Sequence, residues 1–211
     1  MPRKTIYLLT NWMDSRAGTD NNGADTRGKV NTKVAGAGTY RSLSITKDSI
    51  PKGASISRAT IDLTVFVGTG GTDMDNEASS GALDISHYLA TKNPVTEANS
   101  SWNNYDTDKA WSSGGGDYNE YPRTVVTLET SYSDNDVLSH RVTRHLRRSG
   151  VIRHATPCLI HRFAYEGSGP PGNLLSYYSN ADSTESKRPT LTVHYQKRLR
   201  TRPLGRSLIG Y

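Results

Sequence analysis

The chain has 211 residues, the usual length of a single domain, and its 34% of hydrophobic residues and net charge of +6 place it outside the range of disordered chains. No stretch is apolar enough to form a membrane-spanning helix, and the single cysteine, Cys158, excludes an internal disulfide and a cysteine-rich zinc site. The apolar run near the N-terminus is too short for a signal peptide, so we do not expect one in this sequence.

Much of the chain alternates hydrophobic and polar residues with the period of two that is typical of β-strands. In chain order, the sequence predicts strands at 5–10, near 30–35, and at 40–45, 56–67, 82–89, 124–128, 157–165, 174–179 and 190–195. Segments rich in Gly, Asn, Ser and Pro separate these strands. The longest of them predict loops over 11–38 and 91–122.

One segment, 137–148, favours a helix. Leu138, Val142 and Leu146 recur at every fourth position and would form an apolar stripe on one helical face. Arg148 suits the C-terminal end of the helix dipole. We therefore expect a single short helix here, capping one end of the strands.

Short strands that are separated by turns predict an all-β fold, in the form of an antiparallel, jelly-roll-like β-sandwich with one short helix and an extended C-terminal arm. We assign residues 1–195 to the β-sandwich domain and residues 196–211 to the arm. The strand residues expected to face the core are Ile61, Leu63, Val65, Leu191 and Val193.

The arm is strongly basic. Residues 187–211, which include the end of the domain and the arm, contain seven Lys or Arg and no acidic residue, and five of the seven lie in the arm. This leaves 19 basic and 20 acidic groups in residues 1–186. A solvated terminus can have this composition. However, hydrophobic residues interleave with the basic ones, and apolar anchors suit a groove on a protein. We therefore expect the arm to bind a neighbouring protein through Lys197, Arg198, Leu199, Arg200, Arg202, Leu204, Arg206, Leu208, Ile209 and Tyr211.

Several motifs follow one another along the chain. They are Tyr40-Arg41-Ser42-Leu43, the segment 50–63, Ser101-Trp102-Asn103-Asn104-Tyr105-Asp106 followed by Trp111 and Gly114-Gly115-Gly116-Asp117, Asp136-Val137 with Val142, and Lys187-Arg188-Pro189 with Leu191, Val193 and Tyr195. In this order and spacing, over residues 5–195, the motifs resemble those of DNRLRE-type β-sandwich domains. In that family they correspond to two successive strands, a Thr-Trp-Asn-Asn segment, a helical crossover and the closing strand.

Such domains occur as non-catalytic modules of secreted bacterial surface and carbohydrate-active proteins, and in phage virion proteins. The signal peptide that we do not expect here and the arm at 196–211 are departures from the secreted modules, and both favour a virion protein. The resemblance therefore implies a non-enzymatic phage structural protein located in the virion, as a capsid decoration or cement subunit or as a head–tail or tail connector. Its expected partners are other virion proteins and copies of itself, with no membrane, nucleic acid or cofactor.

An alternative from another class is a carbohydrate-binding module that recognises a host or surface glycan. Aromatic residues of the loop region would form its stacking platform, namely Tyr105, Trp111, Tyr118 and Tyr121. Exposed, coplanar rings would favour this alternative, and rings packed inward would argue against it. Two other motif residues have structural interpretations: we expect Arg41 to make a buried charge-assisted hydrogen bond and Trp102 to plug the core.

We expect no catalytic residue, because the sequence contains no recognisable catalytic motif. None of the six histidines lies in a nucleophile or zinc-protease motif, and on the predicted helix His140 and His145 would point about 140° apart. We therefore predict no pocket in which a histidine with a strongly shifted pKa lies beside a nucleophile. Asp73, Asp75 and Glu77 offer oxygen ligands for calcium, but a solvated acidic turn is the preferred interpretation, and we expect no metal.

Overall fold

The computed structural model describes residues 2–31, 38–46, 48, 50, 54–67, 83–128, 132–151, 156–164, 166 and 174–196. Their strands are β1 Arg3–Asp14, β2 Arg27–Asn31, β3 Tyr40–Thr46, β4 Ser55–Thr64, β5 Leu83–Ala90, β6 Asn104–Asp106, β7 Lys109–Ala110, β8 Tyr118–Leu128, β9 Val137–Arg141, β10 Cys158–Phe163, β11 Leu174–Tyr178 and β12 Thr190–Gln196. The helix α1 spans Thr143–Val151, and a 3-10 turn, η1, spans Glu185–Lys187. No helix in this described part has the length and apolar character needed to cross a membrane.

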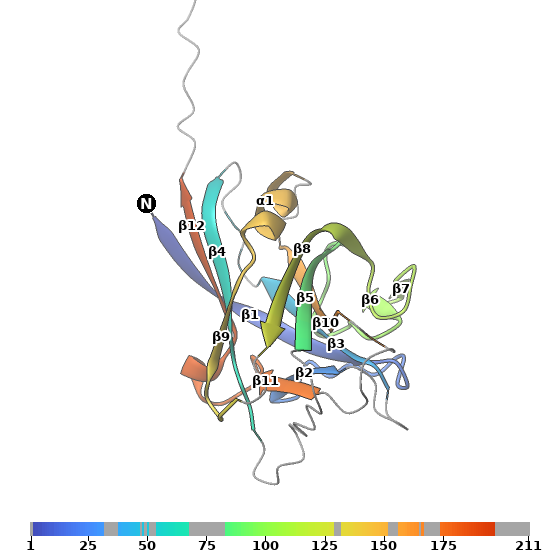
Figure 1. The fold of residues 1–211 in the computed structure, drawn as a ribbon. Coiled ribbons are helices and arrows are strands. Elements are labelled where there is room, and N and C mark those ends of the chain that lie inside the picture. Colours follow the sequence, from blue (N-terminus) through green and yellow to red (C-terminus); the bar gives the residue numbers. More distant parts are fainter. Residues whose placement is uncertain are drawn as a thin grey trace, which may run out of the picture.

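Eight strands form one antiparallel sheet in the order β8-β5-β10-β3-β1-β12-β4-β9. The sheet curls, and β1 runs through both of its halves (Figure 1). Residues 3–7 of β1 pair with β12, whereas residues 8–14 pair with β3. The two outer strands, β8 and β9, meet at one point, where the Thr124 hydroxyl donates to the Arg141 carbonyl at 3.2 Å. The expected all-β, antiparallel, sandwich-like fold is therefore confirmed, with one long strand turning the corner between the halves.

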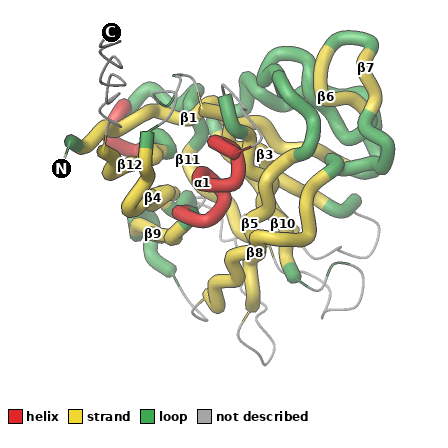
Figure 2. Tube along the Cα trace, turned by 90° about the horizontal axis from the view of Figure 1, so that it is seen from above, coloured by secondary structure: helices red, strands yellow, loops and turns green. Residues whose placement is uncertain are grey.

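Two smaller units complete the fold. β2 and β11 form a two-stranded sheet, which is joined to the large sheet by a bridge between Val65 and Tyr177. β6 and β7 form a short ribbon within the region that connects β5 to β8. Seen from above, α1 lies over one end of the curled sheet (Figure 2).

The core lies between the two halves of the large sheet. Its members alternate along the strands with residues that face outward, because successive side chains of a strand point to opposite faces. The five residues predicted to face the core are confirmed, since none of them exposes more than 1% of its surface: Ile61, Leu63, Val65, Leu191 and Val193. Burial of one such side chain contributes about 1.5–3 kcal/mol.

The predicted helix over 137–148 is wrong in its first half. Residues Val137–Arg141 form β9, which pairs with β4, and α1 begins only at Thr143. The spacing of the hydrophobic residues explains the error, since Leu138 and Val142 are separated by an even number and thus share a face on a strand as well as on a helix. His140 lies between them on that same buried face and makes the segment alternate as a strand does.

The predicted loops were too long. β1 continues to Asp14, and the strand predicted near 30–35 is β2, which ends at Asn31; residues 32–37 lie outside the described residues. The second half of β1 was hidden by polar residues that face inward. Asn11, for example, is buried and donates from its amide to the Ser100 carbonyl at 2.7 Å. At the other end, Gln196 was assigned to the arm but is the last residue of β12.

Candidate functional site

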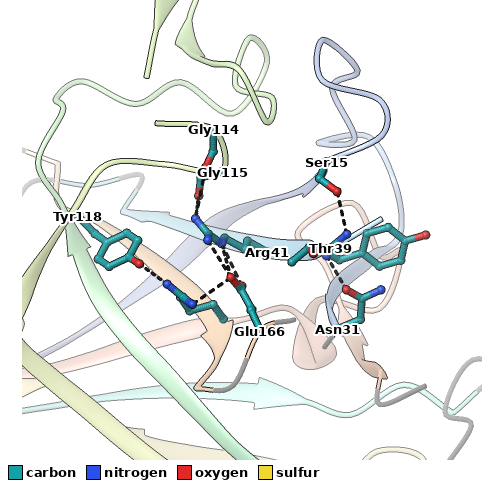
Figure 3. A network of polar contacts seen from close by, with 10 residues as sticks. Ser15, Asn31, Thr39, Arg41, Gly114, Gly115, Tyr118 and Glu166 are labelled. Atoms are coloured by element: carbon teal, nitrogen blue, oxygen red, sulfur yellow. Dashed lines mark hydrogen bonds and ion pairs between the residues drawn. The ribbon is translucent and has the colours of Figure 1, made fainter. Parts of the chain in front are cut away.

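Arg41 lies at the centre of a polar network beside the loop that contains Gly115 (Figure 3). Its guanidinium donates to Glu166 at 2.7 Å and 2.9 Å, and to the Gly115 carbonyl at 2.9 Å. Arg162 approaches the same carboxylate at 3.1 Å and donates to the Tyr118 hydroxyl. The side chains of Arg41 and Glu166 are only 12% and 8% exposed. The expected charge-assisted hydrogen bond of Arg41 is therefore confirmed, and it joins β3 to two distant segments.

Trp102 closes a part of the core next to this network. It packs against a buried cluster that includes Met13 and Ile160, and the guanidinium of Arg41 lies 5.1 Å from the centre of its ring. Gly115 has a left-handed φ of +80°, and a Cβ at this position would lie 2.8 Å from the Trp102 ring. Glycine is thus required here, and the expected role of Trp102 as a plug is confirmed.

The four aromatic residues proposed for glycan stacking do not share one exposed face. Trp111 is 6% exposed, and Tyr105 packs on it with ring centres 5.4 Å apart and planes inclined by 54°. Tyr118 packs on Tyr88 at 4.4 Å. Of the four, Tyr121 alone is open to solvent, with 74% of its surface exposed. By the criterion stated for these rings, their inward packing argues against a carbohydrate-binding platform.

Three histidines from distant parts of the sequence meet in the core. His87 of β5 lies 2.5 Å from His161 of β10, Nδ1 to Nδ1, and its Nε2 lies 2.6 Å from Nδ1 of His140 on β9. His161 in turn contacts the hydroxyl of Ser44 on β3 at 2.7 Å. The three imidazoles are at most 3% exposed. This histidine chain links strands from both halves of the sheet.

The hydrogen bonds within the histidine chain fit neutral imidazoles. A neutral imidazole has one N–H and one bare nitrogen, so His87 donates from one nitrogen and accepts at the other. Burial lowers the pKa of His140 to about 4 and that of His161 to about 3. Burial, and then the neighbouring histidines, lower the pKa of His87 well below its usual value. The three groups are therefore uncharged at neutral pH.

The hydrogen bonds of the histidine chain continue, beyond His161, through hydroxyl groups. The Tyr177 hydroxyl contacts both Ser42 and Ser44, and burial raises its pKa to about 12. All three of these residues are at most 1% exposed. The result is a continuous buried line of polar groups across β9, β5, β10, β3 and β11, which satisfies the hydrogen bonds of polar residues inside the sandwich.

The contact between Ser44 and His161 is a pairing that the sequence-based prediction did not include. The prediction concerned a pocket or cleft in which such a histidine lies beside a nucleophile, and this buried contact is not of that kind. The pair does not lie at a surface opening, because Ser44 and His161 are 1% and 0% exposed. Cys158 is also buried, and burial raises the pKa of its thiol far above the usual range, as expected for an inert core residue. A substrate in solution cannot reach any of these three groups.

Two of the predicted sites fall outside the described residues. The arm residues Lys197–Tyr211 and the calcium candidates Asp73, Asp75 and Glu77 both belong to segments of which the structure gives no description. Within the described residues, no group of three or more His, Cys, Asp or Glu side chains is arranged to hold a metal ion. The histidine chain does not have such an arrangement, because His87 uses its two nitrogens toward two different neighbours.

Comparisons with known proteins give no family. No model of a protein family matches the sequence, and no curated protein matches it significantly. The resemblance to DNRLRE-type domains therefore stays a prediction from the motifs, and the function is inferred from the sequence and the structure.

Proposed function

We propose that this protein is a non-catalytic structural subunit of a phage virion, which binds neighbouring virion proteins and copies of itself through residues 197–211. Its place would be that of a capsid decoration or cement subunit, or of a head–tail or tail connector. The order of the DNRLRE-like motifs supports the virion class. The burial of the potentially reactive groups Ser44, His161 and Cys158 supports binding over catalysis.

The observation that carries the proposal is the way in which residues 197–211 are attached to the sandwich. They follow β12, which lies between β1 and β4 inside the eight-stranded sheet. β12 is paired up to its last residue, where Gln196 faces Ser55, and the Tyr195 amide donates to the Pro2 carbonyl at 3.2 Å. A force that pulls on the arm would therefore act on β12, a strand that is hydrogen-bonded to β1 on one side and to β4 on the other. Such an attachment suits a segment that links one subunit to the next.

The composition of the arm fits a protein partner. Its 15 residues would reach about 50 Å if fully extended, which is the width of a domain of this size. Ordering an extended segment costs about 1–2 kcal/mol per residue in backbone entropy, so the partner has to provide contacts along much of its length. The five basic and five hydrophobic residues of the arm supply ion pairs and apolar anchors for such contacts.

A truncated protein that ends at Gln196 tests the proposal. Because the truncation leaves every described pairing of β12 in place, it should keep the circular dichroism spectrum and melting temperature of the full chain. It should fail to join virions that are assembled without the full-length protein. The matched control replaces Thr201 and Ser207 by alanine, which keeps every basic and hydrophobic side chain of the arm, and it should assemble normally. The proposal is wrong if the truncated protein joins the particles at unchanged occupancy, or if purified virions do not contain the full-length protein.

A further inference from the structure

The described cations divide into two groups according to their partners. Most of those away from α1 pair with a carboxylate, as Arg16 does with Asp14 and Lys109 with Asp106. A second group lies on α1, near the starts of β1 and β4 and at the end of β9. None of its members forms an ion pair with a carboxylate of the described residues. We call this group the arginine surface; it consists of Arg3, Arg58, Arg141, Arg144, Arg147 and Arg148.

The helix contributes three of these arginines on one face. Arg144, Arg147 and Arg148 are separated by three and four positions and are all exposed, whereas His145 and Leu146 between them are fully buried. Like charges at this spacing repel one another, and Arg144 lies in the first turn, where the helix dipole disfavours a cation. The first turn contains no acidic residue. The local sequence thus works against the stability of α1, which is common at functional sites.

The helix face is fixed next to the sheet. The Arg147 guanidinium donates to the carbonyls of Ile56 and Ser57 at 2.6 Å and 3.2 Å. The start of α1 is held by Ala59, whose carbonyl accepts from the Val142 amide at 3.0 Å. These contacts place the helical arginines beside Arg58 of β4, so the surface is formed by α1 together with the strands next to it.

The outer face of the sheet extends the surface. Arg3, His194 and Arg58 stand directly opposite one another on β1, β12 and β4. These three residues form a first row. Their neighbours Val193 and Ala59, one position further along the strands, are buried, so the first row faces outward.

A second outward row lies two positions further along the strands. It runs Thr5, Thr192, Thr60 and Arg141 across β1, β12, β4 and β9. With neighbouring strands about 4.8 Å apart, this row is about 14 Å wide. Together the two rows present guanidinium and hydroxyl groups on one face.

We propose that the arginine surface binds the phosphate backbone of double-stranded nucleic acid without reading its sequence. Guanidinium groups bind phosphate oxygens bidentately, and Arg and Thr side chains are common phosphate contacts. The width of the second row is comparable to that of the major groove, about 12 Å, so phosphates on both of its sides come within reach. This inference goes beyond the proposed function, which concerns residues 197–211 and protein partners, and it departs from the expectation from the sequence that nucleic acid is not a partner.

Two features favour a duplex over other partners. The arginine surface contains no aromatic side chain on which the bases of a single strand would stack. Among the described residues, the two rows and the exposed face of α1 also lack the large hydrophobic anchors that mark the centres of protein interfaces. The exposed ring of Tyr7 lies outside the two rows, two positions beyond Thr5. The arm was expected to prefer protein because its basic residues alternate with hydrophobic ones, and the same criterion applied to the arginine surface favours a polyanion.

Fluorescence anisotropy of the full-length protein with a labelled DNA duplex, at a series of salt concentrations, tests the inference. For four phosphate contacts, the slope of log K against log salt concentration should be about −3.6. Replacing Arg144 and Arg148 by glutamine keeps the helix propensity and the exposed positions. This variant should bind about tenfold more weakly and reduce the slope by about 2.

Two variants with the same change in charge serve as controls. Arg16→Gln with Lys109→Gln removes two cations that are paired with carboxylates, and Arg200→Gln with Arg202→Gln removes two from the arm. Both should bind the duplex nearly as well as the unchanged protein. The inference is overturned if the arm variant loses binding and the Arg144/Arg148 variant does not, or if no duplex binding occurs at low salt. Competition by polyglutamate as strong as that by unlabelled duplex would also overturn it, in favour of an acidic protein partner.

Discussion

Lowering the pH below about 6.5 should destabilise the protein, because the three imidazoles of the histidine chain, those of His87, His140 and His161, are buried in the neutral form. Burial lowers the pKa of His140 to about 4 and that of His161 to about 3, and it also lowers the pKa of His87. In the unfolded chain the same imidazoles bind protons at a pKa of about 6.5. Below this pH the unfolded state binds more protons than the folded state, so the free energy of unfolding falls as the pH falls.

The size of the effect follows from these pKa values. Each group contributes about 1.4 kcal/mol per pH unit between its pKa in the folded state and its pKa in the unfolded state. Between about pH 7 and about pH 4.5, His140 and His161 together account for about 5 kcal/mol, and His87 adds to this loss. Carboxylates with ordinary pKa values near 4 titrate mostly below this range. Since domains of this kind have a total stability of about 5–15 kcal/mol, the protein should be close to unfolding at about pH 4.5.

Urea denaturation at a series of pH values, followed by tryptophan fluorescence, measures this dependence. His140→Gln should reduce the slope by about 1.4 kcal/mol per pH unit, because the amide still offers His87 a hydrogen bond but does not titrate. His194→Gln, on the outer face of the sheet, leaves the histidine chain intact and serves as the matched control for replacing a histidine by glutamine. A free energy of unfolding that stays constant from about pH 7 to about pH 4.5 would refute the reasoning. Imidazoles of His87, His140 and His161 that titrate near 6.5 by NMR in the folded protein would refute it as well.

Three substitutions in the sandwich have expected effects on stability, each measured by chemical denaturation at neutral pH. Ile61→Ala removes a fully buried side chain and should cost about 2–5 kcal/mol, and a loss below about 1 kcal/mol would place Ile61 outside the core. Glu166→Gln leaves the buried guanidinium of Arg41 without its counter-charge and should cost about 3–5 kcal/mol, whereas an unchanged stability would show that the Gly115 carbonyl suffices. Gly115→Ala combines a positive φ with a clash against Trp102 and should cost about 1–3 kcal/mol; wild-type stability would contradict the described turn.

The strands of the core could be predicted because their pattern is local. Leu191 and Val193 alternate with threonines, and this period of two distinguishes a half-buried strand from other structures. The second half of β1 escaped prediction because its inward side chains are polar, as at Thr10 and Asn11. Their partners, Asn180 and Ser100, lie far away in the sequence, so nothing near β1 shows that these polar groups are satisfied.

The histidine chain could not be predicted for the same reason. His87, His140 and His161 are each separated by more than 20 residues, and they meet only because β5 pairs with β10 and the curled sheet brings β9 across from them. His140 was also placed on a helix, where it would have pointed elsewhere. Because His140 lies two positions from both Leu138 and Val142, an interpretation of this segment as a strand would have placed its side chain on the buried face.

The contrast between paired and unpaired arginines is likewise a product of the fold. In the sequence, neither Arg41 nor Arg144 is closely followed by an acidic residue, so the two arginines look alike. In the fold, however, Arg41 contacts Glu166, which lies 125 positions away. Arg144 has no such carboxylate among the described residues. Which cations remain available for a partner is therefore decided by long-range pairing, whereas the basic character of residues 197–211 is visible in the composition alone.

The central claim, that the protein is a virion subunit held to its neighbours by residues 197–211, is tested most directly by cryo-electron microscopy of the intact virion. The account predicts density for the sandwich on the particle, with the arm that follows Gln196 lying on an adjacent protein chain. The hydrophobic side chains of that arm, such as Leu204 and Leu208, should be buried in the neighbour. An arm that folds back on its own sandwich with no neighbouring chain in contact, or particles that lack the protein, would contradict the account.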